Sequence, residues 1–250
     1  MTLAGLRQRP AYSLYQLLWG ALDWVFPPNC GGCAKFAERW CQDCQAALVR
    51  LPETVCLLCG TPLPASGSCA DCQTTLPEYR GLRSVCAYSG PARRAVIRLK
   101  YSKDIGLGEA LSRHLVQLFL SSHWQIDRVT CVPLSRGRLK YRGYNQSAML
   151  ARPLALAIQR PFTPLLLRKT REAPTQVGLS ANERRKNVDG AFAAGEKTIL
   201  TGRTILVVDD VTTTGSTMNA CARALKEAGA AAVYGLTFAR AGLHDPIGHP

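Results

Sequence analysis

The chain has 250 residues and a mass of 27.2 kDa, which suits one large domain or a mid-sized domain with a small one. Apolar residues make up 47% and charged residues 19%, so a sizeable core is expected and disorder is excluded for most of the chain. The formal net charge is +14, and residues 134–190 contribute +9 of it, which fits either a solvated basic surface or a site for phosphates or nucleic acid.

The first predicted element is an amphipathic helix within residues 1–26. Its apolar residues recur at helical spacing: Leu14, Leu17, Leu18, Ala21, Leu22, Val25 and Phe26. Gln16 and Asp23 interrupt the stretch, and no small-residue cleavage site precedes Cys30, so packing of the apolar face on the rest of the protein is favoured. A cleaved signal peptide and docking on a membrane surface stay open as alternatives. No apolar run of 18 residues occurs, so no transmembrane segment is expected.

Four C-x-x-C pairs follow within 43 residues: Cys30/Cys33, Cys41/Cys44, Cys56/Cys59 and Cys69/Cys72. Two such pairs complete a tetrahedral shell around Zn²⁺, so residues 27–75 are predicted to form a double zinc ribbon with two structural zinc ions. Sequential and interleaved pairing of the four pairs are both open. A secreted disulfide framework is the alternative, but the regular spacing favours metal and hence a reducing, cytoplasmic compartment.

Residues 76–241 are expected to form an α/β domain, and residues 242–250 a tail. Helices are predicted over 91–101, 107–120, 145–160 and 217–228, with one more starting at the S-x-x-E capping box of Ser180 and Glu183. Strands are predicted within 73–85 and over 126–132, 164–168, 204–208 and 233–238. The alternation of strands and helices predicts a mainly parallel sheet with helices on both faces.

The segment from Ile205 to Thr217 carries the clearest chemistry. A buried strand ends in Asp209 and Asp210, where ligands bind in open α/β sheets. Small hydroxyl residues and a glycine then lead into a helix N-terminus: Thr213, Thr214, Gly215, Ser216 and Thr217. Backbone N–H groups at such a turn bind anions. Carboxylates that can bind hydroxyl groups, next to a turn that can bind phosphate, suit a sugar phosphate as the ligand. The glycine motifs of nucleoside-triphosphate sites and of dinucleotide sites are absent.

This segment resembles the 13-residue phosphoribosyl-diphosphate (PRPP) signature of the type I phosphoribosyltransferases. The order of motifs along the chain, from about Leu14 to Arg240, is similar to the ComF/GntX family, bacterial proteins with a double zinc ribbon before a phosphoribosyltransferase domain. The further motifs that carry this resemblance are Leu99-Lys100-Tyr101, Arg142-Gly143-Tyr144-Asn145-Gln146 and the spacing of Gln176, Leu179, Arg184, Asn187 and Phe192.

The resemblance implies a role for each site residue. Asp209 and Asp210 would be the catalytic pair that binds the ribose 2′- and 3′-hydroxyls, and the residues from Thr213 to Thr217 would hold the 5′-phosphate. The pyrophosphate loop would be Ser135, Arg136, Gly137 and Arg138, with Mg²⁺ bound together with PRPP. A flexible lid would correspond to residues 168–187. Lys100 is interpreted as a helix end with favourable dipole placement.

Three functions are compatible with these motifs. The first is a phosphoribosyltransferase, a glycosyltransferase with an unknown acceptor. The second is a PRPP-sensing regulator without turnover, in a gluconate-utilisation type of role. The third is a non-catalytic competence factor that binds single-stranded DNA during DNA uptake, with other bacterial proteins as partners. In this third function the basic segment and the ribbons would bind the DNA. The sequence specifies neither the acceptor nor the oligomeric state.

Overall fold

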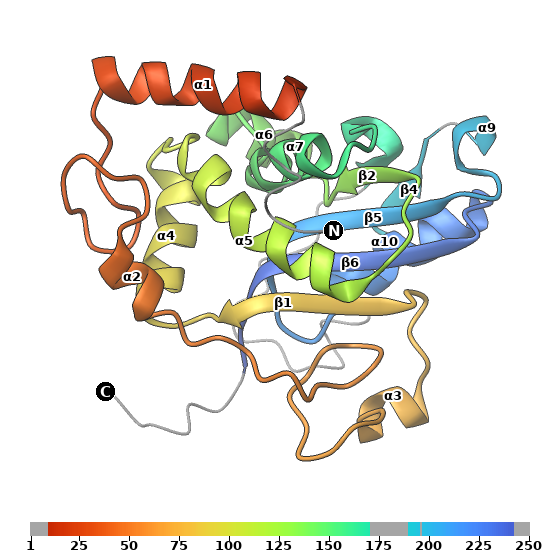
Figure 1. The fold of residues 1–250 in the computed structure, drawn as a ribbon. Coiled ribbons are helices and arrows are strands. Elements are labelled where there is room, and N and C mark those ends of the chain that lie inside the picture. The colour runs from red at the N-terminus through yellow and green to blue at the C-terminus, as the bar shows by residue number, and fades with distance from the viewer. Residues whose placement is uncertain (1–9, 171–189, 196, 243–250) are drawn as a thin grey trace.

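The centre of the molecule is a parallel sheet whose four strands follow the order β1-β6-β5-β2, in a computed structural model that describes residues 10–170, 190–195 and 197–242 (Figure 1). The strands are β1 (Gly81–Ala87), β2 (Arg128–Cys131), β5 (Thr204–Thr212) and β6 (Ala232–Arg240). Along β5, Ile205 and Val207 are buried in one core, and Leu206 and Val208 in the other. Burial on both faces explains why this strand is apolar at successive positions.

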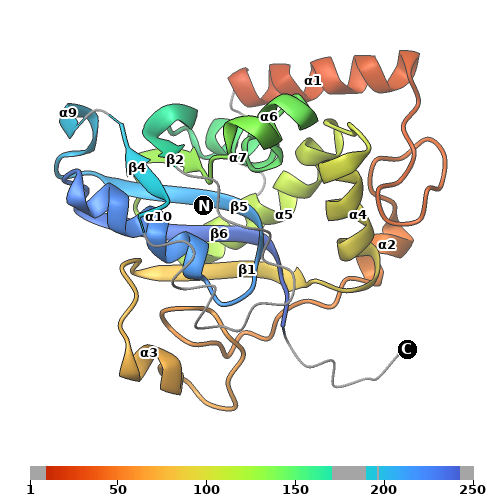
Figure 2. The same ribbon diagram turned by 180° about the vertical axis from the view of Figure 1, so that it is seen from behind.

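Helices cover both faces of the sheet (Figures 1 and 2). On one face lie α5 (Leu107–Ser122) and α7 (Gln146–Ile158), and α4 (Gly90–Tyr101) packs on α5. On the other face α10 (Ser216–Glu227) lies beside a small antiparallel pair. That pair consists of β3 (Leu167–Lys169) and β4 (Phe192–Ala194). The predicted parallel α/β sheet with helices on both faces is confirmed.

Most predicted boundaries agree with the structure to within a few residues, and the differences are local. Helix α7 continues through Pro153. The strand predicted over residues 164–168 begins as a 3-10 turn, η2 (Pro164–Leu166), where proline at the first turn position favours helical geometry. A short helix, α9 (Lys197–Leu200), was not anticipated. The predicted capping box, nearly all of the predicted lid and most of the Q, L, R, N and F spacing lie outside the described residues.

The N-terminal helix α1 (Pro10–Val25) forms as predicted but turns a different face inward. Tyr12 is buried, and Trp19 and Asp23 are half-buried. The carboxylate of Asp23 accepts a hydrogen bond from Arg39 Nε at 3.0 Å, and the guanidinium of Arg39 lies 4.7 Å from the centre of the Trp19 ring. The large side chains of the predicted apolar face are 48–72% exposed. The expected packing of that face is therefore wrong, because an aromatic stripe and a shielded ion pair make the contact instead.

No helix of the described residues is both long and apolar enough to cross a membrane. The exposed face of α1 is thus a surface feature of a helix that lies along the outside of the molecule (Figures 1 and 2).

The cysteine-rich segment forms two loops that pack differently. The first contains α2 (Gln42–Ala46) and is held at α4, where Arg98 Nη1 donates to the carbonyl of Cys30 at 2.7 Å. The second contains α3 (Ala70–Thr74), and its buried cysteines belong to the hydrophobic cluster on the α10 side of the sheet. Leu82 N of β1 donates to the carbonyl of Leu58 at 2.7 Å, which attaches the second loop to the edge of the sheet.

Candidate functional site

The eight C-x-x-C sulfurs form two sites of four. One site holds Cys30, Cys33, Cys41 and Cys44, and the other holds Cys56, Cys59, Cys69 and Cys72. Within each site all four sulfur atoms lie within 4.8 Å of one another. The pairing is therefore sequential, and the interleaved alternative is excluded.

Both sites fit a tetrahedral zinc ion. Sulfur–sulfur distances of 3.5–3.6 Å are close to the edge of about 3.8 Å that Zn–S bonds of about 2.3 Å require. Burial acts to raise the pKa of the Cys30 thiol, but backbone N–H donors from Cys41 and Gly32, among others, lower it overall to about 6. The same balance lowers the pKa of Cys56 to about 6. These donors favour the thiolate form of one cysteine in each site, whereas burial raises the pKa of Cys44 and Cys72. A zinc ion bound by four thiolates has no open position, so the sites suit a structural metal.

The two neighbouring acids lie at the carboxyl end of β5, against the N-terminus of α7. Ser147 Oγ donates to Asp209 Oδ1 at 2.7 Å, and Gln146 Nε2 donates to Asp210 Oδ1 at 3.2 Å. Lys100 Nζ, from the last turn of α4, forms an ion pair with Asp210 Oδ2. Since Asp210 is only 3% exposed, this ion pair is largely shielded from water.

The two carboxyl groups have opposite pKa shifts. Burial, together with the negative charge of Asp210, raises the pKa of Asp209 to about 8, and the hydrogen bond from Ser147 offsets this only in part. Burial also acts to raise the pKa of Asp210, but the charge of Lys100 outweighs it and holds that pKa low. Near neutral pH the pair therefore keeps one proton, mainly on Asp209, and one negative charge that faces Lys100.

Two motifs that are far apart in the sequence meet beside this acid pair. The hydroxyl of Tyr144 donates to the carbonyl of Leu99. The guanidinium of Arg142 lies 5.2 Å from the centre of the Tyr101 ring and also donates to Gln146, which in turn contacts the acid pair. The L-K-Y and R-G-Y-N-Q motifs thus form one support for the acids.

The loop after the acid pair turns directly into α10. Gly215 has φ 80°, and a Cβ there would lie 2.8 Å from the hydroxyl of Tyr79, so both conformation and space favour glycine. Thr214 Oγ1 and Ser216 Oγ are 2.7 Å apart. The residues predicted to bind phosphate all lie in this loop or in the first turn of α10: Thr213, Thr214, Gly215, Ser216 and Thr217. Hydroxyls and first-turn N–H groups together make a cradle suited to a phosphate.

The segment predicted as a pyrophosphate loop is mostly a short helix, α6 (Arg136–Arg142). Ser135 caps it and accepts a hydrogen bond from Arg138 N at 3.5 Å, which explains why a helix begins here. Because β2 runs parallel to β5, this segment leaves the sheet at the carboxyl end of the strands, which is also where the acid pair lies. Arg136, Gly137 and Arg138 are exposed, and within the described part of the chain neither arginine forms an ion pair with the acids.

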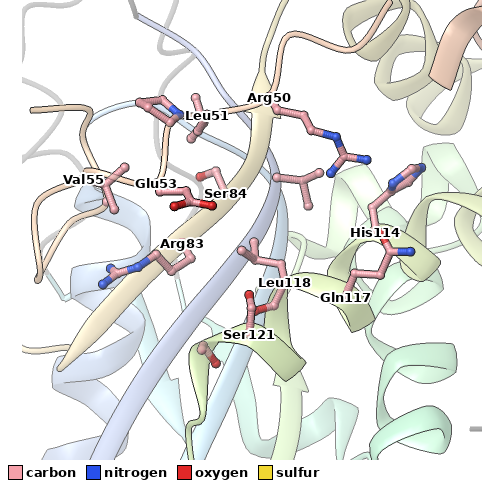
Figure 3. A pocket seen from close by; sticks show the side chains of 14 residues that line it. Arg50, Leu51, Glu53, Val55, Arg83, Ser84, His114, Gln117, Leu118 and Ser121 are labelled. Carbon is pink, nitrogen blue, oxygen red and sulfur yellow. The ribbon is translucent and has the colours of Figure 1, made fainter. Parts of the chain in front are cut away.

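A separate cavity of about 530 Å³ lies between residues 50–55, β1 and α5 (Figure 3). The side chain of Arg50 points toward His114, whereas Arg83 turns away and donates to the carbonyl of Leu57 at 3.1 Å. Burial lowers the pKa of His114 to about 4, so this imidazole is neutral near pH 7. None of the residues predicted to bind PRPP or zinc lines the cavity, which belongs to the junction between the second ribbon and the sheet.

Comparison with known proteins agrees with the two kinds of site. Residues 21–73 match the model of the double zinc ribbon domain, and residues 145–242 match that of the phosphoribosyl transferase domain. "DNA utilization protein YhgH" of Escherichia coli K12 is 35% identical over 201 residues, which are 77% of this chain and 86% of that protein. This chain belongs to the ComF family. "Competence protein F" of Haemophilus influenzae is 30% identical over 222 residues, which are 85% of this chain and 96% of that protein.

Among solved structures, this ComF-family chain is similar to the glutamine PRPP amidotransferase of B. subtilis. The identity is 26% and the TM-score 0.37, and the match covers 57% of this chain and 27% of that one. Neither of the two domain models covers residues 74–144, the segment that contains Lys100.

Three residues that contact the acid pair were not assigned to the site from the sequence: Lys100, Gln146 and Ser147. Gln146 belongs to a motif of the ComF family, which was a usable signal. Lys100 does lie in the last turn of α4, as interpreted from the sequence, but that interpretation was incomplete because its charge also neutralises a buried aspartate. Its neighbours in the sequence could not show this, since the partner lies 110 positions away.

Proposed function

We propose that this ComF-family chain binds PRPP together with Mg²⁺ and transfers its phosphoribosyl group to an acceptor. The supporting observation is an acid pair, with Asp210 buried and Asp209 half-buried, followed at once by a phosphate cradle at the start of α10. In this proposal Asp209 and Asp210 hold the ribose 2′- and 3′-hydroxyls, and the loop from Thr213 to Thr217 holds the 5′-phosphate. When bound together with PRPP, Mg²⁺ would supply positive charge that stabilises the leaving diphosphate.

The proposed transfer breaks the bond between ribose C1 and the diphosphate oxygen. Pyrophosphate leaves with the electron pair, while a nitrogen of the acceptor bonds to C1 and releases a proton. Positioning and charge stabilisation provide most of the acceleration in such a reaction. We assign Ser135, Gly137 and the guanidinium groups of Arg136 and Arg138 to the leaving pyrophosphate, because this segment, which is exposed from Arg136 to Arg138, follows β2 at the end of the sheet that holds the acids.

Calorimetry with PRPP and Mg²⁺ tests this proposal. Asp209→Ala and Asp210→Ala are each expected to weaken binding by roughly tenfold or more, since each removes a carboxyl group that the proposal places on a ribose hydroxyl. Glu227→Gln, an exposed acid at the far end of α10, is the matched control and should leave binding unchanged. Equal affinity in all four proteins, or no binding by the unaltered chain, would contradict the proposal.

Release of pyrophosphate from PRPP in the presence of nitrogen nucleophiles tests turnover. If PRPP binds but no pyrophosphate is released, the regulatory alternative, a PRPP-sensing protein, is favoured over the transferase.

A second candidate function, binding of single-stranded DNA, is supported by the surface of α6. This short helix exposes Arg136, Arg138 and Lys140 beside Tyr141, whose side chain is 87% exposed. Positive charge with an exposed aromatic ring is the combination that binds single strands. The names of two relatives, "DNA utilization protein" and "Competence protein F", point the same way.

The DNA proposal predicts binding that weakens steeply with salt and that Tyr141→Ala reduces, whereas Leu76→Ala, another highly exposed side chain, does not. A flat salt response would exclude α6 as a phosphate-tracking surface. Competition by PRPP would show that PRPP and DNA bind at the same site, at the carboxyl end of the strands.

We also propose that the protein works in the cytoplasm with two bound Zn²⁺ ions. None of the eleven cysteines forms a disulfide, and the three outside the ribbons, Cys86, Cys131 and Cys221, are buried. A reducing compartment keeps such thiols available for metal. Residues 1–26, 27–75 and 76–241 are the proposed helix, ribbon and transferase units, followed by a tail over 242–250.

A further inference from the structure

We infer that Arg240 is a positioning residue through which the second zinc site holds the phosphate loop in place. The inference rests on the proposed function for the role of that loop. Arg240 is the last residue of β6 and is 4% exposed. It lies opposite Thr212 of β5 in the strand register, directly beside the point where the phosphate loop begins.

The guanidinium of Arg240 joins two segments that are far apart in the sequence. Nη1 donates to the carbonyl of Thr213, in the phosphate loop, at 3.1 Å, and to Thr61 Oγ1 at 3.4 Å. Nη2 donates to the carbonyl of Cys59, one of the four cysteines of the second zinc site. Hydrogen bonds from a charged donor are stronger than neutral ones, and a planar guanidinium can serve several acceptors at fixed angles.

A second contact from the same side supports the loop. Tyr79, in the segment that leaves the second ribbon, is 4% exposed and lies beneath Gly215. Next to it, the backbone N–H of Glu78 donates to Asn219 Oδ1, in the first turns of α10, at 2.6 Å. The second ribbon therefore reaches the start of the phosphate loop through Arg240, and its exit segment lies against Gly215 and the first turns of α10.

The first zinc site has no equivalent contact among the described residues. Its backbone carbonyls accept hydrogen bonds from α4, where Arg98 donates to Cys30. The sulfurs of this site form their own cluster with Trp40, apart from the cluster that includes the second site and α10. The two ribbons are thus expected to affect the phosphate loop unequally.

Arg83 provides a matched control for Arg240. Arg83 is half-buried, whereas Arg240 is buried, but it holds the same ribbon, because its guanidinium donates to the carbonyls of Cys56, Leu57 and Leu82. It makes no hydrogen bond to the phosphate loop within the described residues. Arg83→Met and Arg240→Met both detach a guanidinium from the second ribbon, but only the second change removes the link to Thr213.

The test is hydrogen–deuterium exchange of peptides that cover residues 213–217, measured on the zinc-loaded full chain without PRPP. Arg240→Met is expected to speed exchange there by about tenfold or more, as the loss of charged hydrogen bonds predicts, with Arg83→Met close to the unaltered protein. Equal effects of the two changes, or no effect of Arg240→Met, would overturn the inference. If Arg240→Met loses zinc or fails to fold, Arg240→Lys replaces it and should also loosen the loop, because one ammonium cannot reach all three acceptors.

A second set of variants distinguishes the effects of the two zinc sites on the phosphate loop. Cys69→Ser disrupts the second site and is expected to speed exchange over residues 213–217, whereas Cys33→Ser disrupts the first and should not. Equal responses would overturn the link through the second site. PRPP affinity is then measured on the same proteins and should fall about tenfold or more only where the loop is loosened. Because the exchange measurement needs no PRPP, failure of the unaltered chain to bind PRPP would refute the proposed function and leave the structural link independently tested.

Discussion

At the scale of single residues, the acid pair predicts a pH dependence of ligand binding. Asp209 has a pKa raised to about 8 in the free site, whereas hydroxyl donors and Mg²⁺ favour its ionised form. Binding must therefore release a proton below that pH, so affinity for Mg²⁺-PRPP should rise with pH up to about 8 and then level off. Calorimetry in buffers of different ionisation enthalpy counts the proton. Asp209→Asn should bind more weakly and without this slope; an unchanged slope would show that another group titrates.

Lys100 gives a second prediction at this scale. Lys100→Met leaves the carboxylate of Asp210 buried without its partner, and breaking a buried pair in this way costs about 3–5 kcal/mol in free energy of unfolding. The matched control is Lys226→Met, which breaks an exposed ion pair with Glu78 and should cost about 0–1 kcal/mol. Urea unfolding measures both. Adding Asp210→Asn to Lys100→Met should recover part of the loss, because it removes the orphaned charge; no recovery would count against this account.

At the scale of elements, α1 shows that the more hydrophobic face of a helix is not always the buried one. Leu17→Glu changes a side chain that is 70% exposed and should alter the free energy of unfolding by less than about 0.5 kcal/mol. Tyr12→Ala removes a buried ring and should cost about 3 kcal/mol. Thermal or urea unfolding distinguishes the two. A large loss from Leu17→Glu would mean that this face packs against something after all.

The two ribbons predict the metal content. The intact protein should carry two zinc ions per chain, and Cys30→Ser or Cys56→Ser should each remove one, because each site holds its own four thiols. Elemental analysis of the purified proteins measures this. Loss of both ions from either change would indicate a shared cluster rather than two separate sites.

At the scale of the whole molecule, the sheet should be the most stable part. All four side chains from Ile205 to Val208 are 0% exposed, as are Val233 and Phe238 in the neighbouring strand β6. Amides of β5 and β6 should therefore exchange with deuterium most slowly, at rates set by global unfolding, and those of residues 50–55 much faster. Fast exchange in β5 would show that the centre of the sheet opens locally.

The sequence by itself determined the local features: the apolar strand β5, helices α4, α5 and α10, the four C-x-x-C pairs and the loop from Asp209 to Thr217. These depend on spacing within a few residues, where periodicity and turn chemistry act directly. Even there it did not anticipate the conformation of the predicted pyrophosphate segment, most of which is the short helix α6, capped by Ser135.

Only the tertiary structure decided which distant residues share a site. The sequential pairing of the zinc ligands, the ion pair of Lys100 with Asp210 and the bonds of Arg240 to Cys59 and Thr213 each join positions that sequence neighbours do not connect. The face of α1 that turns inward was decided in the same way, because Asp23 on that face accepts a hydrogen bond from Arg39. The physical reason is that burial and charge pairing depend on which surfaces meet across the sheet, and that is a property of the folded chain.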